Sequence, residues 1–217
     1  WLLTWIGRSA VLVTARCTTG RPAFSSMSPG AVTMALVGSR LRVFLVSTHV
    51  ALSRALRQVT PRRLASTLEH ARAHLAPALR REPRLAVAAW NPHAGEDGHI
   101  GREDDELVRP ALARAGRMGA AWMGGVPVLS ADTVFVRAAR GEFDAVVACY
   151  HDQGLIPIKL LAFGRAVNVT IGLPIVRTSV DHGTAYDIAG RGVADHGSLV
   201  EAIALAARLA GGTGRRR

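Results

Sequence analysis

The sequence predicts an α/β protein with a largely parallel sheet. Short apolar runs, typical of buried strands, alternate along the chain with longer stretches whose apolar residues recur at helical spacing. Strands that alternate with helices usually pair in parallel and are covered by those helices. The chain has 217 residues, of which 49% are hydrophobic, and this is enough for one large domain or two small ones.

The individual elements follow from local signals. Thr60 and Pro61 form a strong helix start, because threonine caps the first turn and proline fits it. Asp132 is a plausible helix cap, and we assign it no chemistry. Strand-like runs occupy residues 11–14, 41–48, 85–90, 126–129, 145–149, 166–171 and 175–180, and helices are expected at residues 50–53, 60–75, 104–118 and 198–209.

Charge and cysteine content narrow the class of protein. The formal charge is +11, from 27 basic and 16 acidic residues, but the arginines are scattered and lack interleaved aromatic residues. We therefore expect attraction for anionic substrates and no nucleic-acid partner. No apolar stretch is long enough to span a membrane. Cys17 and Cys149 suggest no disulfide framework, and Cys149 lies in an apolar run, so we expect an inert thiol and a cytoplasmic location.

Three histidines share one position relative to the predicted strands. His49, His93 and His151 each follow an apolar run, and the carboxyl ends of parallel strands meet at one sheet edge, where ligands bind. Three neutral imidazoles suit a divalent transition metal with open positions for substrate oxygens. Asp152 is placed to orient one imidazole or to join the coordination. Taken singly, each histidine has the alternative of a capping or core role.

Two further histidines lie on the helix that begins at Thr60. His70 and His74 are four residues apart, which is also a spacing of metal ligands. No third ligand accompanies them in the sequence. A solvated helix face is therefore the preferred interpretation.

Residues suited to an anion follow His151. Lys159 is the only lysine in the chain, and Asn168 and Arg177 follow it at intervals of nine residues. An ammonium, an amide and a guanidinium are the groups expected around a phosphate or a carboxylate. The alternative is a surface arginine and a turn asparagine.

A compact loop of mostly small residues follows the last predicted strand. Small side chains let a backbone approach a flat or anionic ligand closely. The sequence has no G-x-G-x-x-G after a strand, so the Rossmann fingerprint does not support a dinucleotide here. The loop contains His182, Gly183, Thr184, Ala185 and Asp187.

Five motifs occur in order along the chain, at residues 47–52 (STHVAL), 91–96 (NPHAGE), 150–154 (YHDQG), 167–174 (VNVTIGLP) and 177–185 (RTSVDHGTA). They resemble the 4-hydroxythreonine-4-phosphate dehydrogenase family of vitamin B6 (pyridoxal phosphate) biosynthesis, and the resemblance covers roughly residues 40–210. The loop at His182 is also similar to the NAD-adenosine loop of the isocitrate and isopropylmalate dehydrogenase fold.

The resemblance implies an isocitrate/isopropylmalate dehydrogenase-like, two-domain α/β/α subunit in a homodimer whose active site lies at the dimer interface. It implies NAD-dependent oxidation of 4-phosphooxy-L-threonine and decarboxylation to 3-amino-2-oxopropyl phosphate. It also implies a divalent metal (zinc, magnesium or cobalt) with ligands from both subunits. The implied roles are metal binding for His49, His93 and His151, substrate binding for Lys159, Asn168 and Arg177, catalysis for Lys159 and Asp152, and NAD binding for His182, Gly183, Thr184, Ala185 and Asp187.

The chain departs from the family at its amino end. Family members are longer there, and their Gly-His-Thr-Glu-Phe motif corresponds here to Gly-Arg-Pro-Ala-Phe at residues 20–24. We expect residues 1–38 to be a poorly matching remnant of an incomplete first domain. Residues 39–175 would form a metal- and substrate-binding α/β domain, and residues 176–217 the NAD-loop segment and a helix returning to the first domain.

Some alternatives stay open within this resemblance. One is a dehydrogenase of a four-carbon sugar-acid phosphate, erythronate or threonate 4-phosphate. Another is an inactive truncated remnant. The choice between NAD and NADP is also open, although the charge of Asp195 near the adenosine loop disfavours a 2′-phosphate.

Overall fold

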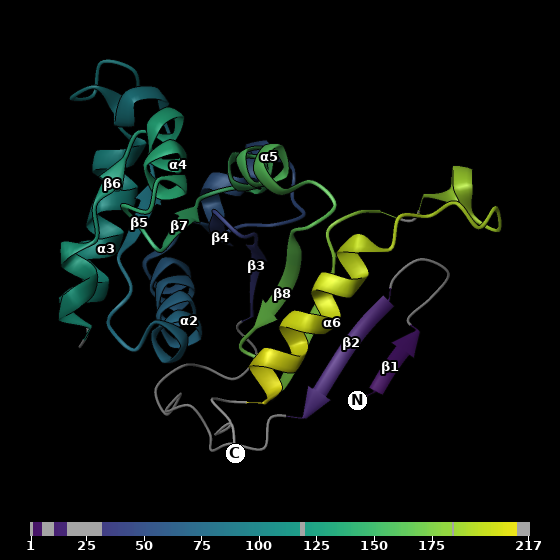
Figure 1. Cartoon of the computed structure of the whole chain (residues 1–217). Helices are drawn as coiled ribbons and strands as arrows, with labels where there is room; N and C mark the ends of the chain where they lie inside the picture. Colours follow the sequence, from purple (N-terminus) through teal and green to yellow (C-terminus); the bar gives the residue numbers. More distant parts are fainter. Residues whose placement is uncertain (1, 6–10, 17–31, 118–119, 184, 212–217) are drawn as a thin grey trace.

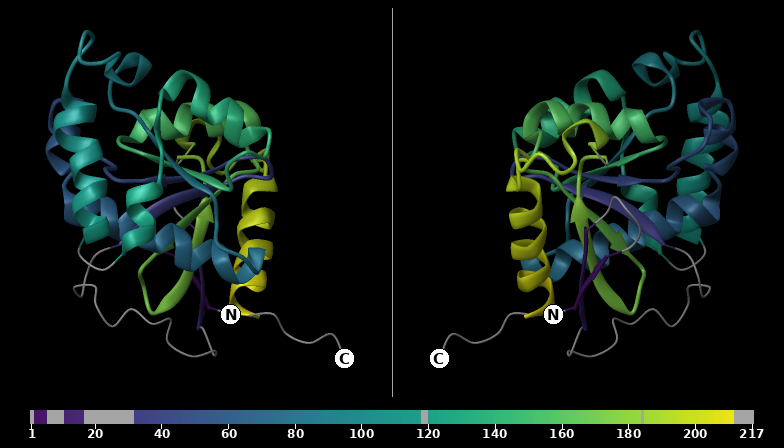
Figure 2. Two further views of the ribbon diagram at one scale, coloured as in Figure 1. Left: turned by 90° about the vertical axis from the view of Figure 1, so that its left-hand side faces the viewer. Right: turned by 90° about the vertical axis from the view of Figure 1, so that its right-hand side faces the viewer.

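The computed structural model describes residues 2–5, 11–16, 32–117, 120–183 and 185–211. Within these residues one sheet has the strand order β1-β2-β9-β8-β3-β4-β7-β5-β6, with helices on both faces (Figure 1, Figure 2). The predicted α/β class is confirmed. The strands are β1 (Leu2–Trp5), β2 (Val11–Arg16), β3 (Thr33–Val37), β4 (Arg42–Leu45), β5 (Leu85–Ala88), β6 (Val128–Leu129), β7 (Ala145–Ala148), β8 (Val167–Ile171) and β9 (Ile175–Val180).

The four predicted helical segments are present, and the structure adds two long helices that were not expected, at residues 131–139 and 151–162, together with several short ones. Thr60 caps α2 as expected, because its side-chain oxygen accepts a hydrogen bond from Arg63 N at 3.2 Å. The long helices are α2 (Pro61–Leu79), α3 (Arg109–Arg117), α4 (Ala131–Ala139), α5 (His151–Ala162) and α6 (Gly197–Ala210). The short ones are α1 (Leu52–Ala55), η2 (Leu56–Gln58), η3 (Pro92–Gly95), η4 (Asp104–Val108), η5 (Ala121–Gly125) and η6 (Tyr186–Ile188).

The sheet has a parallel half and an antiparallel half. Strands β4, β7, β5 and β6 pair in parallel. The remaining neighbours, from β1 through β2, β9, β8 and β3 to β4, pair antiparallel. The antiparallel pairing has a local cause in β8 and β9, because the short turn at residues 172–174 joins adjacent strands only as a hairpin.

Three layers form the core. Helices α2 and α3 pack on one face of the parallel half, and α4 and α5 pack on the other. Helix α6 packs on β8 through Val169, which pairs with Ala35, a core residue on the face covered by α2. Helices α2, α3 and α6 therefore share one side of the sheet, and α4 and α5 share the other.

The two histidines of α2 face the sheet, so the interpretation as a solvated helix face is wrong. His70 is 2% exposed, and its Nδ1 lies 2.7 Å from Thr33 Oγ1 on β3. The ring of His74 meets Phe44 of β4 edge-on, with centroids 6.2 Å apart. Burial, helped by the charge of Arg42, lowers the pKa of His74 to about 4. Both residues lie at the borders of the apolar face of α2, and the sheet is wide enough to cover these borders too.

Cys149 is a buried thiol, as predicted. It follows β7, is fully buried, and its Sγ lies 3.4 Å from Ala88 O. Burial raises the pKa of this thiol to about 12, so it carries no thiolate at neutral pH. Cys17 lies outside the described residues. Among the described helices, none has the length and apolar character needed to cross a bilayer.

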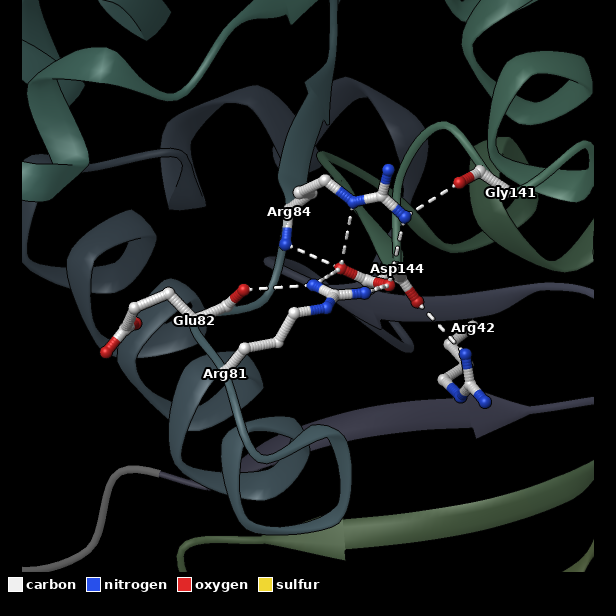
Figure 3. A network of polar contacts seen from close by, with 6 residues as sticks. All are labelled: Arg42, Arg81, Glu82, Arg84, Gly141 and Asp144. Atoms are coloured by element: carbon white, nitrogen blue, oxygen red, sulfur yellow. Dashed lines mark hydrogen bonds and ion pairs between the residues drawn. The ribbon is translucent and has the colours of Figure 1, made fainter.

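A buried carboxylate joins the amino ends of β5 and β7 (Figure 3). Asp144 accepts two hydrogen bonds from the Arg81 guanidinium, each at 2.7 Å, and one from Arg84 N at 2.7 Å. Arg42 donates to the Asp144 backbone oxygen at 3.3 Å. The Arg81 hydrogen bonds hold the pKa of Asp144 well below its usual range. This network lies at the end of the parallel strands opposite to the three predicted histidines.

Candidate active site

The carboxyl ends of β4, β5 and β7 share one edge of the sheet, which we call the histidine edge because His49, His93 and His151 follow these strands. The rings of His49 and His151 lie side by side, with centroids 5.2 Å apart. His151 Nδ1 is 2.6 Å from Asp152 Oδ1, so the carboxylate orients this ring and Nε2 remains for a ligand. A carboxylate in this position is typical of metal-binding histidines.

His93 has a different neighbour at the same edge. Its Nδ1 lies 4.0 Å from Asp132 Oδ2, at the start of α4. Within the described ranges, no three His, Cys, Asp or Glu side chains are arranged to hold a metal ion, so His93 does not join His49 and His151 in the single chain. The sequence assigns Asp132 only the role of a helix cap, but Ser130 is the N-cap of α4 and Asp132 lies in the first turn of that helix. It follows β6, the next parallel strand, and the rule that selected the histidines also applies to it.

The loop after β5 has a strained backbone. His93, Ala94, Glu96 and Asp97 have φ angles of 52°, 56°, 45° and 53°, in the left-handed region that costs a non-glycine residue about 1–2 kcal/mol. The buried carboxylate of Asp104 anchors the start of the loop by accepting hydrogen bonds from Trp90 N (2.6 Å) and Asn91 N (2.8 Å). Strain that persists under such anchoring is typical of functional sites.

Helix α5 carries the predicted lysine along the same pocket as His151. A pocket of about 650 Å³ is lined by His151, Asp152 and Lys159 together with apolar residues of α5. Lys159 is eight residues beyond His151, which is about 12 Å along a helix axis. The lysine therefore lies at the other end of the pocket from the imidazole. The apolar lining residues are Leu155, Ile156, Leu160 and Phe163.

Asn168 and Arg177 lie on the face of the sheet that α5 covers. Asn168 pairs with Leu36, a core residue on the α5 side. Arg177 pairs with Thr170, two residues further along β8, and its guanidinium donates to the Thr170 hydroxyl. Asn168 and Arg177 are thus diagonal neighbours, within reach of one bound group. Asn168 Oδ1 is buried and has no hydrogen-bond partner among the described residues.

The His182 loop leaves the sheet at the opposite end from the histidine edge. Strand β8 runs in the direction of β4, and β9 runs against it. The loop follows β9, and in the strand order of the sheet β8, β3, β4 and β7 lie between β9 and β5, so the loop is far from β5 and β6 (Figure 1). His182, Gly183 and Asp187 are exposed, and Ala185 has a φ of 48°; Thr184 lies outside the described residues. In one chain the loop and the paired histidines do not meet.

Gly154 sets the distance between α5 and the sheet. A Cβ added to it would lie 2.5 Å from Val43 Cγ1 and 2.9 Å from Leu45 Cδ2. We expect Gly154→Ala to destabilise the protein by about 1–3 kcal/mol, because overpacking forces the helix away. Denaturant unfolding measures this, with Gly124→Ala as the control, since nothing lies within 4 Å of a Cβ there. Equal effects of the two changes would show that α5 has room to adjust.

Comparison with known proteins decides the family. A sequence model described as the pyridoxal phosphate biosynthetic protein PdxA matches residues 20–206. The chain belongs to the PdxA family. It is 52% identical over 179 residues to the 4-hydroxythreonine-4-phosphate dehydrogenase of Geobacter metallireducens, covering 82% of this chain and 52% of that protein. It is 48% identical over 180 residues to the D-threonate 4-phosphate dehydrogenase of Cupriavidus necator, covering 82% and 53%.

A solved PdxA-family structure agrees with this assignment. The crystal structure of 4-hydroxythreonine-4-phosphate dehydrogenase from Klebsiella pneumoniae superimposes with a TM-score of 0.71 at 42% identity, over 82% of this chain and 54% of that one. The chain spans about half the length of the curated relatives it matches. Residues 20–24, where we expect the counterpart of the Gly-His-Thr-Glu-Phe motif, fall within the PdxA match and outside the described residues.

The histidine pair fits a divalent metal in its donor chemistry. Two imidazole nitrogens, one of them on a ring oriented by a carboxylate, are ligands that zinc and cobalt accept readily. His49 and His151 would hold the ion. The family resemblance implies ligands from both subunits, so His93 stays a predicted third ligand.

Proposed function

We propose that the chain is a dehydrogenase like the PdxA relatives to which it is similar, and that it carries out the NAD-dependent oxidation of 4-phosphooxy-L-threonine with decarboxylation to 3-amino-2-oxopropyl phosphate. The observation that carries this proposal is the His49–His151 pair with Asp152, at a strand edge of a PdxA-family chain. When bound, the divalent cation stabilises negative charge on substrate oxygens and NAD accepts a hydride.

The residues of this chain then have separate tasks. Arg177 and Asn168 bind the substrate phosphate, since a guanidinium and an amide both donate to phosphate oxygens. Asp152 keeps His151 in the tautomer that ligates the cation. Lys159 takes the proton of the substrate hydroxyl or returns a proton after decarboxylation, as its place in the α5 pocket allows. The His182 loop binds the adenosine end of NAD.

Helix α5 supports a homodimer. Leu160 is 82% exposed and Phe163 is 77% exposed, and Ile156 beside them is also exposed. A contiguous apolar patch of this kind marks an interface more often than a free surface. A second copy seated on α5 would bring its own loops to the pocket that contains His151 and Lys159. Sedimentation of the purified chain tests this, and a monomer at all concentrations would count against it.

D-threonate 4-phosphate is the second candidate substrate. Relatives from Bradyrhizobium diazoefficiens and Cupriavidus necator, 50% and 48% identical, are named for it. The two substrates share a phosphate and a secondary alcohol, so the same anion-binding groups serve either. Erythronate 4-phosphate is a variant of this alternative. A cytoplasmic location and the absence of a nucleic-acid partner stay predictions from composition.

One assay separates these possibilities. The full chain is incubated with NAD, zinc or cobalt, and either 4-phosphooxy-L-threonine or D-threonate 4-phosphate, and NADH formation is followed by absorbance. NADH from the first substrate supports the main proposal, and NADH from the second alone supports the alternative. Metal binding without NADH from any phosphorylated acid would identify a remnant that retains its metal site and has lost catalysis.

A further inference from the structure

Gln153 connects two of the strand ends that carry the predicted metal ligands. Its side chain lies in the first turn of α5 and is 7% exposed. Cys149 N, at the end of β7, donates to Gln153 Oε1 at 2.7 Å. Gln153 Nε2 donates to Ala89 O, at the end of β5, at 2.6 Å. The oxygen and the nitrogen of this amide therefore each make a hydrogen bond, and the two bonds go to the ends of different strands.

The amide stands where the strand pairing stops. Strands β5 and β7 pair in register up to Val87 and Val147, and the same register two residues later would place Ala89 opposite Cys149. The Gln153 amide bridges these two backbones, because it accepts from Cys149 N and donates to Ala89 O. It therefore links the two strand ends from which the loops of His93 and His151 leave the sheet.

The other side of Cys149 is fixed as well. Its carbonyl accepts hydrogen bonds from Ser47 N at 3.2 Å and from Ser47 Oγ at 2.9 Å. Ser47 is buried and lies two residues before His49. The Cys149 peptide is thus held by the segment after β4 through Ser47 and by α5 through Gln153. His151 lies between Cys149 and Gln153, so the Gln153 amide connects the residues that flank it on either side.

We propose that Gln153 is a positioning residue of the metal site, whose amide sets the spacing between the His151-bearing and His93-bearing strand ends. This inference rests on the proposed function for its metal. The competing explanation is that Gln153 only caps α5, as glutamine or glutamate at the third helical position does by accepting from a backbone N–H before the helix. The two explanations differ in what they require of Nε2, because a cap needs only the oxygen.

Gln153→Glu separates them. Glutamate keeps the acceptor for Cys149 N and loses the donor to Ala89 O. We expect cobalt affinity, measured by titration of the cobalt absorption band, to fall about tenfold, the lower end of the effect of losing a group that orients a metal ligand. The added negative charge would by itself strengthen the binding of a cation. A loss of cobalt affinity must therefore come from the lost hydrogen bond and not from the change in charge. Gln153→Met, which lacks both contacts, should behave the same way.

Thr178→Val is the matched control. Thr178 is also buried, and its hydroxyl donates to Ala202 O at 2.9 Å, between β9 and α6. Removing this hydrogen bond costs stability without touching the histidine edge. Cobalt affinity within twofold of the unaltered chain is expected for Thr178→Val. If Gln153→Glu also retains full affinity, Gln153 is only a helix cap and the proposal is overturned.

A second readout needs no metal. The His49 and His151 rings, 5.2 Å apart, should give cross-peaks between their ring protons in nuclear Overhauser spectra of the histidine-labelled chain. These cross-peaks should weaken in Gln153→Glu and persist in Thr178→Val. If the unaltered chain binds no cobalt, the proposed function fails, while the cross-peaks still decide whether Gln153 positions the rings. Unchanged cross-peaks in Gln153→Glu would refute the positioning role.

Discussion

Replacing His151 with alanine is expected to lower the affinity for cobalt or zinc by on the order of 100-fold or more and to abolish metal-dependent NADH formation. The estimate follows because the loss of a group that merely orients a ligand already costs about 10–100-fold. His49→Ala should have a similar effect, since its ring lies 5.2 Å from that of His151. Calorimetric titration with the metal measures the affinity directly.

His196→Ala is the matched control, because this exposed histidine precedes α6 and lies away from the histidine edge. Its metal affinity should be unchanged. The double change His49→Ala with His151→Ala should cost little more than either alone, because two ligands of one ion are strongly coupled. Fully additive losses would mean that the two rings bind separate ions, and the shared site would have to be abandoned.

Many of the strands and helices of this fold were predictable because they have a local signature. Helix α5 was not predicted, because it contains Gly154 and Pro157, which disfavour a helix interior. The run at residues 145–149 is buried on both faces in β7, and Thr60 caps α2 as the sequence indicates. The burial of His70 was not predictable, because its hydrogen-bond partner Thr33 is 37 residues away in the sequence. Thr33 lies on β3, a strand of the sheet against which α2 packs. Burial of that kind depends on how widely the sheet covers a helix, which helical periodicity does not report.

The candidate site also contains some features that the sequence predicts and others that it does not. Parallel strand ends correctly predict that His49 and His151 meet, since β4 and β7 are neighbours. The neighbour of His93 is Asp132, which is 39 residues later in the sequence, and the left-handed backbone at His93 has no local sequence signal. The distant position of the His182 loop depends on the reversal of β9 against β8. The short turn at residues 172–174 indicates that reversal locally, but the direction of β8 relative to β4 depends on the long-range pairing of both strands with β3.

Asp144→Asn is expected to destabilise the protein by about 2 kcal/mol at neutral pH, because hydrogen bonds to a charged group contribute about 1.5–3 kcal/mol. The Asp144 side chain is 8% exposed and accepts hydrogen bonds from both Arg81 and Arg84, whose own side chains are about half exposed (Figure 3). Denaturant unfolding measures the loss. Glu142→Gln is the control, because its ion pair with Arg137 is exposed and should contribute little to the stability of the protein.

The pH dependence of the stability difference between the unaltered chain and Asp144→Asn identifies the cause of that difference. The Arg81 hydrogen bonds hold the pKa of Asp144 well below its usual range, so its stabilising contribution is complete above the pKa of about 4 of an unfolded aspartate and fades as the pH falls below it. The gap between the unaltered chain and Asp144→Asn should therefore shrink in acid. Burial lowers the pKa of His74 to about 4, so both proteins lose stability below the unfolded histidine pKa of about 6.5, and this loss cancels in the difference. A gap that stays constant down to about pH 3 would assign the loss to packing, because a steric defect does not titrate.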